Sequence, residues 1–310
     1  PSAFPPLRTL EAGSSNLPAA RTSFVGRGEE LASIDRLLDD PGCRLLTLVG
    51  PGGVGKTRLA LEAASHRRDR YQHGVHFVPL AAVASPDLLP AAVAESLGFA
   101  VDSQHSGFAA REQLLDFLRE RDTLLVLDNF EHLVEGSGLL AEVVGAAPRV
   151  ELLATSRERL GIQAEWVLDV DGLDVAGNGH LGAAVQLFVE RARQADPSFV
   201  LTEETRPSVV RIGRQVDGLP LGIELAAAWT AVLPCGEIAA EIERGSDVLA
   251  TTARDVPARH RSLRAVCDQS RSGSRPGADD ALCLRRSNPC PGRVSGLGGA
   301  LRPRRREFPR

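Results

Sequence analysis

Residues Gly50-Pro51-Gly52-Gly53-Val54-Gly55-Lys56-Thr57 fit the pattern G-x-x-x-x-G-K-[ST], in which glycines let the backbone turn its N–H groups inward around an anion. Lys56 is the only lysine of the chain, since all other members of the 36 Lys and Arg are arginine. A compact ammonium on a thin stem reaches phosphate oxygens that a broad guanidinium does not. Thr57 adds a hydroxyl suited to Mg²⁺. These residues predict a loop that binds the phosphates of a nucleotide.

The residues on both sides of this loop have the patterns of a strand and a helix. Residues 44–49 form a short apolar run, and Leu59, Ala60 and Ala63 recur at helical spacing within residues 56–68. A phosphate-binding loop requires a strand before it and a helix after it, so the flanks agree with the motif. A glycine-rich turn without a ligand is the alternative.

Four more apolar runs predict the rest of a sheet. They cover residues 74–80, 124–127, 150–156 and 166–170. The run at 124–127 is apolar throughout, as in a central parallel strand that is covered on both faces. The predicted fold class is α/β: a P-loop NTPase with a parallel sheet flanked by helices, followed by a small helical bundle and a disordered tail.

Asp128 ends the run at 124–127 and is the candidate Walker B acid, which would hold Mg²⁺ together with Thr57. An ordinary aspartate at the start of a loop is the alternative. Asn129 follows, and because an amide cannot accept the proton of an attacking water, Glu131 is the nearest candidate base. Glu131 also fits a first-turn helix acid that faces solvent, and we favour that interpretation. We therefore expect slow ATP hydrolysis, a weak ATPase activity at most.

Arg157 ends the run at 150–156. An arginine at this position could touch the γ-phosphate of a nucleotide and report its presence. The alternatives are an arginine in solvent or one that pairs with Glu158. Asp128, Glu131 and Arg157 are the candidate catalytic residues.

The chain divides by composition into four segments. Residues 1–20, rich in Pro, Ser and Ala, predict an incoming linker, and residues 21–178 predict the nucleotide-binding domain. In residues 179–266 helical patterns replace strand patterns, and Pro220 stands where a helix would begin. Residues 267–310 are dominated by Arg, Gly and Pro, which predicts a disordered tail. That tail is either a basic arm for nucleic acid or, as we favour, a solvated or out-of-frame segment.

Charge and composition exclude several classes of protein. The net charge is −4, but the arginines concentrate in the last fifty residues, so the remainder is acidic and ill suited to a nucleic-acid groove. The sequence shows neither a signal peptide nor a membrane-spanning run, and its five cysteines form no C-x-x-C pair. We expect a cytoplasmic protein with free thiols and no membrane partner. Because methionine is absent, we also expect a piece of a longer protein.

At these motifs the sequence resembles STAND NTPases. Phe24-Val25-Gly26-Arg27 with Glu30 resembles their hhGRxxE entry motif. The segments similar to the Walker A, Walker B, sensor and GLPL elements of NB-ARC-like modules follow in order: Gly50–Thr57 with Arg58-Leu59-Ala60, Leu124–Asn129, Thr155-Ser156-Arg157, and Gly218-Leu219-Pro220-Leu221. The sequence around these motifs is similar to that of bacterial multidomain transcriptional regulators of the LuxR and SARP kinds. The resemblance covers about residues 20 to 266.

The resemblance implies a nucleotide clamped between the sheet and the helical domain. Val25 and Arg27 would lie near the base, Arg58, which follows the loop, would be among the nucleotide-binding residues, and Pro220 would pack against adenine. Adenine is also the default base, because the N-K-x-D loop of guanine-specific proteins needs a second lysine. The implied cofactors are ATP or ADP with Mg²⁺.

Modules of this kind act as switches, closed with ADP and open to self-association with ATP. Moving a population from 1:99 to 99:1 takes about 5.5 kcal/mol of differential binding, so the γ-phosphate must make contacts in one state only. Arg157 is the candidate reporter. The predicted function is an ATP/ADP switch module of a transcriptional regulator that would contact DNA only through domains absent from this chain. A stand-alone P-loop ATPase or phosphotransferase is the alternative, since a phosphate loop alone does not choose between them.

Overall fold

The structure is a computed structural model of the chain, and it describes residues 15–19, 22–99, 107–175 and 181–245. The chain divides into two units, Pro1–Ser274 and Arg275–Arg310, and all described residues belong to the first. The predicted disordered tail, most of the predicted linker and the last part of the predicted helical segment therefore lie outside the described residues.

Five strands form one parallel sheet in the order β2-β3-β4-β1-β5. In β1, Val49 pairs in register with Ser156 of β4 and with Asp169 of β5, so the residues that follow these strands emerge at one edge of the sheet. The predicted α/β fold class is confirmed, and each strand matches one of the five apolar runs. The strands are β1 Leu45–Val49, β2 Val75–Pro79, β3 Thr123–Asp128, β4 Val150–Ser156 and β5 Glu165–Asp169.

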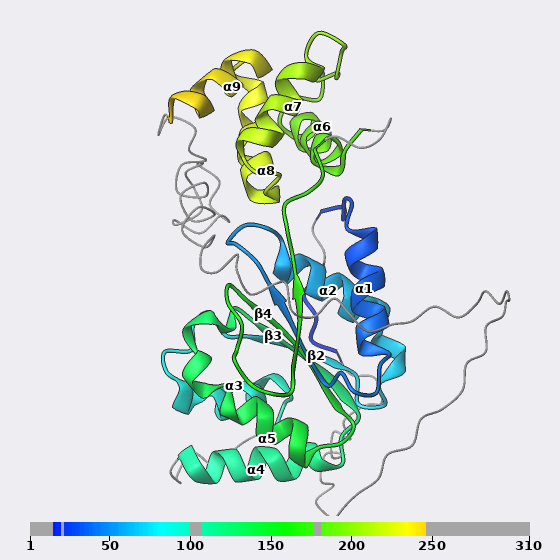
Figure 1. Cartoon of the computed structure of the whole chain (residues 1–310), viewed down its shortest axis with the longest axis vertical. Coiled ribbons are helices and arrows are strands. Elements are labelled where there is room, and N and C mark those ends of the chain that lie inside the picture. Colours follow the sequence, from blue (N-terminus) through cyan, green and yellow to red (C-terminus); the bar gives the residue numbers. More distant parts are fainter. Residues whose placement is uncertain (1–14, 20–21, 100–106, 176–180, 246–310) are drawn as a thin grey trace, which may run out of the picture. The chain divides into compact units, whose positions relative to one another are not determined.

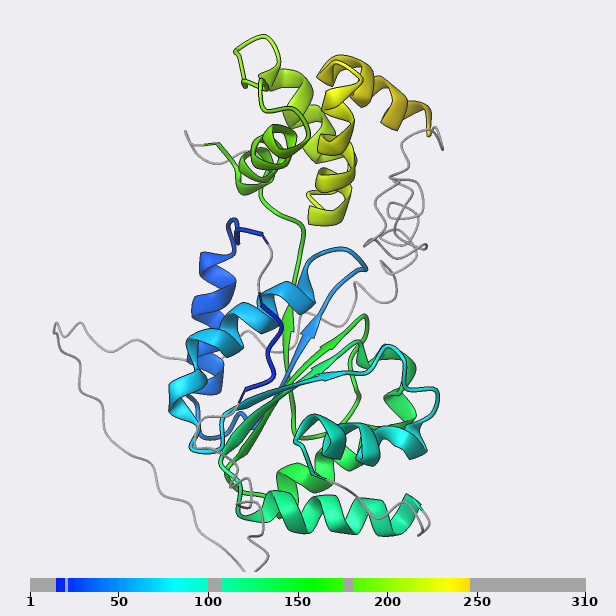
Figure 2. The same cartoon turned by 180° about the vertical axis from the view of Figure 1, so that it is seen from behind.

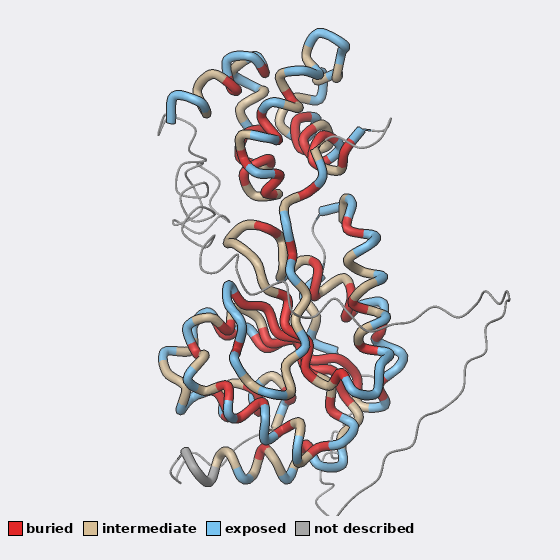
Figure 3. The backbone as a smooth tube through the Cα atoms, in the orientation of Figure 1, coloured by how far each residue is buried: buried red, intermediate tan, exposed pale blue. Residues whose placement is uncertain are grey.

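Helices cover both faces of the sheet. Because side chains alternate along a strand, Leu124 and Val126 of β3 face one core while Leu125 and Leu127 face the other. Two helices, α1 and α2, pack on the first face, and α3, α4 and α5 pack on the second (Figure 1), as the reverse view in Figure 2 also shows. Figure 3 shows the strands as a buried layer between half-exposed helices. The helices are α1 Gly28–Leu38, α2 Lys56–His66, α3 Leu89–Ser96, α4 Gly107–Arg119 and α5 Gly138–Ala146.

A helical segment follows the sheet within the described residues. It comprises α6 Ala183–Ala195, α7 Arg206–Gln215, α8 Pro220–Ala228 and α9 Cys235–Arg244. The first three were expected from apolar spacing, and Pro220 begins α8, where its missing N–H costs nothing. Buried Phe188, Ile212, Ile223 and Ile238 form its core. Short 3₁₀ helices complete the described elements: η1 Arg68–Arg70, η2 Pro86–Leu88, η3 Phe130–His132, η4 Val134–Gly136 and η5 Trp229–Ala231.

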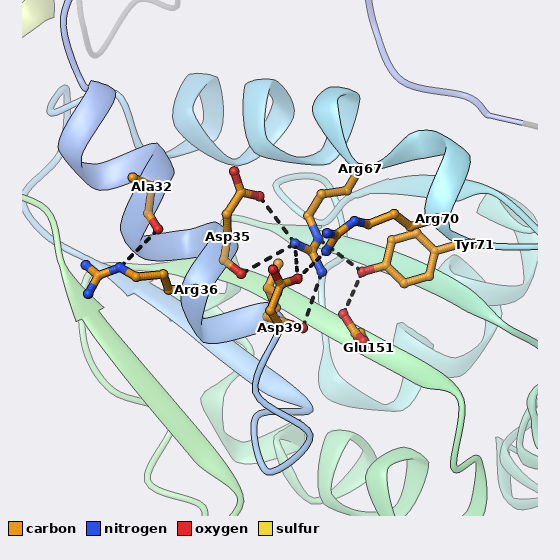
Figure 4. A network of polar contacts seen from close by, with 9 residues as sticks. Ala32, Asp35, Arg36, Asp39, Arg67, Arg70, Tyr71 and Glu151 are labelled. Carbon is orange, nitrogen blue, oxygen red and sulfur yellow. Dashed lines mark hydrogen bonds and ion pairs between the residues drawn. The ribbon is translucent and has the colours of Figure 1, made fainter.

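A polar network fastens α1 to the end of α2 and to β4 (Figure 4). The buried Arg67 guanidinium donates to Asp35 at 3.3 Å and to Asp39 at 2.8 Å. Tyr71 donates to Glu151 at 2.5 Å, and burial raises the pKa of both groups. Because the phosphate loop leads into α2, this network fixes the position of α1 relative to the helix that follows the loop.

The described end of the predicted linker contacts the edge of the sheet. Ser15 forms a parallel bridge with Val75 of β2, and the Asn16 side chain bonds both the N–H and the carbonyl of Phe77. Within the described ranges, no helix is both long enough and apolar enough to cross a lipid bilayer. Two of the expected free cysteines, Cys43 and Cys235, are described, and both are free and buried.

Candidate nucleotide site

A cavity of about 350 Å³ lies where β1, β3 and β4 end. Its size falls within the usual range of ligand pockets, about 300–1,000 Å³. Four parts of the chain contribute to its lining: the N-terminal segment 22–25 with Arg27, the loop 52–55 with the start of α2, the residues at and after the ends of β3 and β4, and the helices α6 and α8. The lining includes, among the predicted site residues, Val25, Arg27, Gly52, Gly53, Val54, Gly55, Lys56, Thr57, Arg58, Glu131, Arg157 and Pro220. Gly50 and Asp128 are not in the lining but bond to Lys56 and Thr57, which are.

The loop between β1 and α2 needs glycine at defined positions. Gly53 and Gly55 have φ of 79° and 93°, in the left-handed region where a side chain is strained. A β-carbon on Gly50 would lie 2.4 Å from the carbonyl oxygen of Val170, the residue after β5. The loop therefore keeps this course only with glycine at these three positions.

Lys56 begins α2, and its ammonium points back along the loop. It donates to the carbonyl oxygens of Gly50 at 2.7 Å and Pro51 at 3.0 Å. The pKa of Lys56 is lowered to about 8, mainly by burial and also by the charge of Arg157, although the carboxylates of Glu131 and Asp128 oppose the shift. A buried ammonium with a lowered pKa is stabilised by any anion that enters the cavity.

Thr57 and Asp128 meet as expected from the motifs. The Thr57 hydroxyl donates to Asp128 Oδ1 at 2.6 Å, and the hydroxyl of buried Thr155 donates to the same oxygen at 2.7 Å. Thr155 Oγ1 in turn accepts the backbone N–H of Asn129 at 2.9 Å. Asn129 adopts the left-handed conformation with φ 67°, which turns the chain sharply after β3. The Asp128 carboxylate is thus held between two hydroxyls at the carboxyl end of β3.

Glu131 and Arg157 form an ion pair. Arg157 Nε donates to Glu131 Oε1 at 3.0 Å, with side-chain exposures of 40% and 19%. The interpretation that we favoured for Glu131, an acid facing solvent, is therefore wrong, because its side chain lines the cavity, and its second oxygen is buried without a hydrogen bond. The alternative pairing of Arg157 with Glu158 is also wrong. Because β3 and β4 are neighbours in the sheet, Glu131 and Arg157 lie within hydrogen-bond distance although they are 26 residues apart in the sequence.

Arg27 is buried, and both terminal nitrogens of its guanidinium donate to protein groups. Its guanidinium donates to the carbonyl oxygens of Val54 at 3.0 Å and Asp171 at 2.6 Å and to Glu30 Oε1 at 2.6 Å. Arg27 itself has φ 66° at the start of α1. The Arg and Glu of the entry motif therefore join α1 to the phosphate loop and to the chain after β5.

Arg58 fixes the N-terminal segment 22–25 over the cavity. Its guanidinium donates to the carbonyl oxygen of Thr22 at 2.5 Å and lies 5.9 Å from the centre of the Phe24 ring, a cation–π distance. On the other side, Ser23 donates to Glu190 of α6. The segment that carries Val25 is held from α2 and from α6 together.

The predicted GLPL element contacts the phosphate loop directly. The N–H of Leu221 donates to the carbonyl oxygen of Gly53 at 3.2 Å, and Pro220 Cγ lies 3.7 Å from the position of a β-carbon on Gly55. The preceding turn is tight, because Gly218 has φ 65° and its carbonyl accepts the N–H of Leu173 at 2.8 Å. The start of α8 therefore packs against the loop.

Two charged residues of the cavity were missed in the sequence analysis, Arg191 of α6 and Glu224 of α8. Arg191 is only 9% exposed and donates from Nε to Glu224 at 3.0 Å. A signal was present: Arg191 stands three residues after Phe188 and four after Leu187, on the apolar face of its helix, where an arginine is rare unless it is paired.

Several known proteins are similar to this chain. An uncharacterised protein of Mycobacterium tuberculosis is 37% identical over 220 residues, which cover 71% of this chain and 53% of that protein. A putative HTH-type transcriptional regulator of the same species is 36% identical over 228 residues, which cover 73% of this chain and 25% of the regulator. The chain thus spans about half the length of the first relative and a quarter of the second. A solved STAND protein with a tetratricopeptide repeat sensor, from Pyrococcus horikoshii, aligns over 77% of this chain and 34% of its own, with 14% identity and a TM-score of 0.46.

The match to a family extends over most of the described chain. Residues 23–202 fit the model of the AAA ATPase domain, which spans the phosphate loop, Asp128, Arg157 and the start of the helical segment. The resemblance to a P-loop ATPase module of bacterial regulators is confirmed by this match together with the regulator among the relatives. The chain belongs to the AAA ATPase domain family.

Proposed function

We propose that this chain is an adenine-nucleotide-binding regulatory module that changes state between ADP and ATP and hydrolyses ATP slowly. The observation that carries the proposal is the 2.6 Å hydrogen bond between Thr57 and Asp128, beside the ammonium of the only lysine. It places a hydroxyl, a carboxylate and a cation at the N-terminus of α2, where backbone N–H groups and the helix dipole favour an anion. Membership in an ATPase domain family agrees with this arrangement.

The phosphates would be held by the loop between β1 and α2. Backbone N–H groups of residues 52–57 would surround them. The positive φ angles of Gly53 and Gly55 allow the loop to form such a concave arrangement of N–H groups. Lys56 would exchange the carbonyls of Gly50 and Pro51 for phosphate oxygens. The exchange is favourable because an anion offsets the desolvation that lowers the pKa of this ammonium.

Thr57 and Asp128 fit a magnesium ion. Both present hard oxygen atoms at one place, and Thr155 orients the Asp128 carboxylate from behind. Bound Mg²⁺ supplies neutralisation of charge on the β- and γ-phosphate oxygens. Thr57 and Asp128 are the residues that would hold it.

The base would lie between the N-terminal segment and α8. Val25, Leu173 and Pro220 give this end of the cavity apolar walls. Arg27 has its donors engaged by Val54, Asp171 and Glu30, so its role would be to shape the pocket. Arg58 would act similarly by holding the segment that carries Val25.

Slow hydrolysis would follow from Asn129, the residue after Asp128, because an amide cannot accept the proton of an attacking water. Glu131, the nearest candidate base, is bound to Arg157. The γ-phosphate of ATP would compete with Glu131 for Arg157, and ADP would not. Arg157 would then report the nucleotide state, and Glu131 would become free to accept a proton from water only after ATP is bound.

A regulatory role is favoured by the relatives. One of them is named a putative HTH-type transcriptional regulator, and this chain covers a quarter of its length. Partners would be the nucleotide and, in the ATP state, further copies of the module. DNA would be reached through domains outside this chain.

The first experiment measures nucleotide binding by titration calorimetry on the wild-type chain and on Lys56→Ala. Arg36→Ala is the matched control, since it removes an exposed cation from α1 that does not line the cavity. We expect ADP to bind the wild type and the control, and to bind Lys56→Ala at least about 100-fold more weakly. Equal binding by all three proteins would remove the basis of the proposal.

A stand-alone ATPase is the second candidate, and turnover decides between the two. Glu131 in the cavity is the observation that favours it. Steady-state hydrolysis above about one per second without a partner would support the enzyme and contradict the switch.

A further inference from the structure

Arg191 and Glu224 form a charged pair inside the cavity that the proposed phosphate and magnesium sites do not use. Arg191 is 9% exposed, and its guanidinium donates to Glu224 Oε1 at 3.0 Å and to Glu190 Oε1 at 2.7 Å. Arg191 and Glu224 line the cavity, and Glu190 does not. One cation is thus shared by two carboxylates, and one of these carboxylates faces the cavity.

The charge balance at this place is informative. A buried arginine needs one carboxylate for neutrality, so the second makes the cluster of Arg191, Glu190 and Glu224 negative by one unit. A net negative charge repels phosphate and suits hydroxyl or amine donors. At the start of α2, by contrast, Lys56 and the helix N-terminus favour an anion, beside the paired charges of Glu131 and Arg157. These two parts of the lining therefore suit different groups of one ligand.

The position of Glu224 on α8 indicates which donor it would meet. Pro220 and Glu224 both line the cavity, and they lie four residues apart on one helical face. The start of α8 bonds to the phosphate loop through the N–H of Leu221 and the carbonyl oxygen of Gly53, and Glu224 stands four residues after Pro220, about 6 Å along the helix axis. That offset matches the span of a pentose attached to a phosphate held by the loop.

The Glu224 carboxylate is both held and accessible. Its side chain is 41% exposed, and its hydrogen bond from Arg191 engages Oε1. A carboxylate accepts hydrogen bonds from ribose hydroxyls in dinucleotide sites of the doubly wound fold, and a vicinal diol presents two donors to it. Arg191, buried and bonded to Glu190 as well, restricts the rotamers that Glu224 can adopt.

We propose that Glu224, positioned by Arg191, accepts a hydrogen bond from the ribose of the bound nucleotide and makes the site selective for ribonucleotides over deoxyribonucleotides. The proposal rests on the proposed function, because the ligand is the same adenine nucleotide. If Glu224 made no contact with the ribose, the pair of Arg191 and Glu224 would only link α6 to α8, and ribonucleotides and deoxyribonucleotides would bind with equal affinity.

The test compares the affinities of ADP, 2′-deoxy-ADP, 3′-deoxy-ADP and inosine diphosphate for three proteins. These are the wild type, Glu224→Gln, and the matched control Glu190→Gln, which removes the same charge from the other carboxylate bonded to Arg191, outside the cavity. We expect the wild type to bind at least one deoxynucleotide about tenfold more weakly than ADP. We expect Glu224→Gln to reduce that ratio below about threefold and Glu190→Gln to retain it.

Each result has a defined meaning. If the wild type binds ADP in a Lys56-dependent manner but does not distinguish the deoxynucleotides, the ribose contact is wrong and the nucleotide site stands. If Glu224→Gln weakens ADP but not inosine diphosphate, Glu224 reads the exocyclic amine of the base instead, which also overturns the ribose contact. If ADP does not bind the wild type at all, both the function and this inference fail. Melting temperatures within a few degrees of the wild type would show that both variants are folded.

Discussion

Arg157 Nε donates to Glu131 Oε1 at 3.0 Å, although 26 residues separate the two along the chain. Glu131 follows β3 and Arg157 follows β4, and these strands are neighbours in the sheet. The two side chains with candidate roles at the γ-phosphate thus bind each other. Under the proposed function, a ligand that takes the arginine would free the carboxylate, so recognition of ATP and activation of water would be coupled through one hydrogen bond.

The first prediction concerns the preference for ATP over ADP. In Arg157→Ala we expect ADP affinity to change less than about twofold and ATP affinity to fall about tenfold, since only the γ-phosphate would contact this guanidinium. Competition titrations with both nucleotides measure the ratio. Arg159→Ala, an exposed arginine two residues on that does not line the cavity, should behave as wild type. Equal weakening of ATP and ADP by Arg157→Ala would show that the residue is no reporter of nucleotide state.

The second prediction concerns magnesium. Asp128→Asn keeps an acceptor for Thr57 and Thr155 but removes the charge that a divalent cation needs. We expect ADP binding in EDTA to be unchanged and the gain in affinity on adding Mg²⁺ to disappear. Titration of both proteins with and without Mg²⁺ measures that gain. If the variant retained the full gain, Asp128 would not belong to the metal site.

The features predicted correctly from the sequence are those with local signals. The run 124–127 is apolar throughout because β3 is buried on both faces, so the sequence alone predicts this strand. The loop between β1 and α2 is likewise predictable, because its backbone geometry dictates glycine at Gly53 and Gly55 and the motif pairs these glycines with a lysine. Such signals depend on neighbours in sequence and not on tertiary packing.

The features that were missed depend on which strands and helices become neighbours. The partner of Arg157 follows from the order of the strands, and no pattern within residues 150–158 encodes that order. The pairing of Arg191 with Glu224 likewise depends on the packing of α6 against α8. An arginine on an apolar helix face indicates a buried partner but does not identify it.

The third prediction concerns pH. Burial lowers the pKa of Lys56 to about 8, and a bound phosphate raises it again because it favours the charged ammonium. The form of the protein with protonated Lys56 is therefore the one that binds, so ADP affinity reaches its maximum at pH values below 8. It weakens as the pH rises above 8, by up to about tenfold per pH unit until the pKa of the bound state is reached.

Calorimetry at several pH values checks this dependence, and buffers of different ionisation enthalpy reveal the proton taken up on binding at pH 8 and above. Lys56→Arg is the informative variant, because arginine stays charged throughout this range and should give weaker but pH-independent binding. A flat profile for the wild type would mean that the free ammonium keeps its ordinary pKa.

The last prediction separates two arginines that share one carboxylate. Arg67 and Arg70 both donate to Asp39, but their side chains are 5% and 54% exposed. Arg67 also donates to the carbonyl oxygen of Leu38 at 3.3 Å and contacts the hydroxyl of Tyr71 (Figure 4). Replacing Arg67 by alanine therefore removes a buried guanidinium together with its bonds to the buried Leu38 carbonyl and to two carboxylates, whereas replacing Arg70 leaves Asp39 to solvent and to Arg67.

We expect Arg67→Ala to lower the free energy of unfolding by about 2–3 kcal/mol and Arg70→Ala to lower it by less than about 0.5 kcal/mol. Urea unfolding followed by circular dichroism measures both, and an unchanged slope against denaturant confirms that the midpoints are comparable. Similar losses from the two variants would show that the charge on Asp39, and not the burial of Arg67, sets the strength of the network. Because neither arginine lines the cavity, the fraction that remains folded should bind ADP as the wild type does.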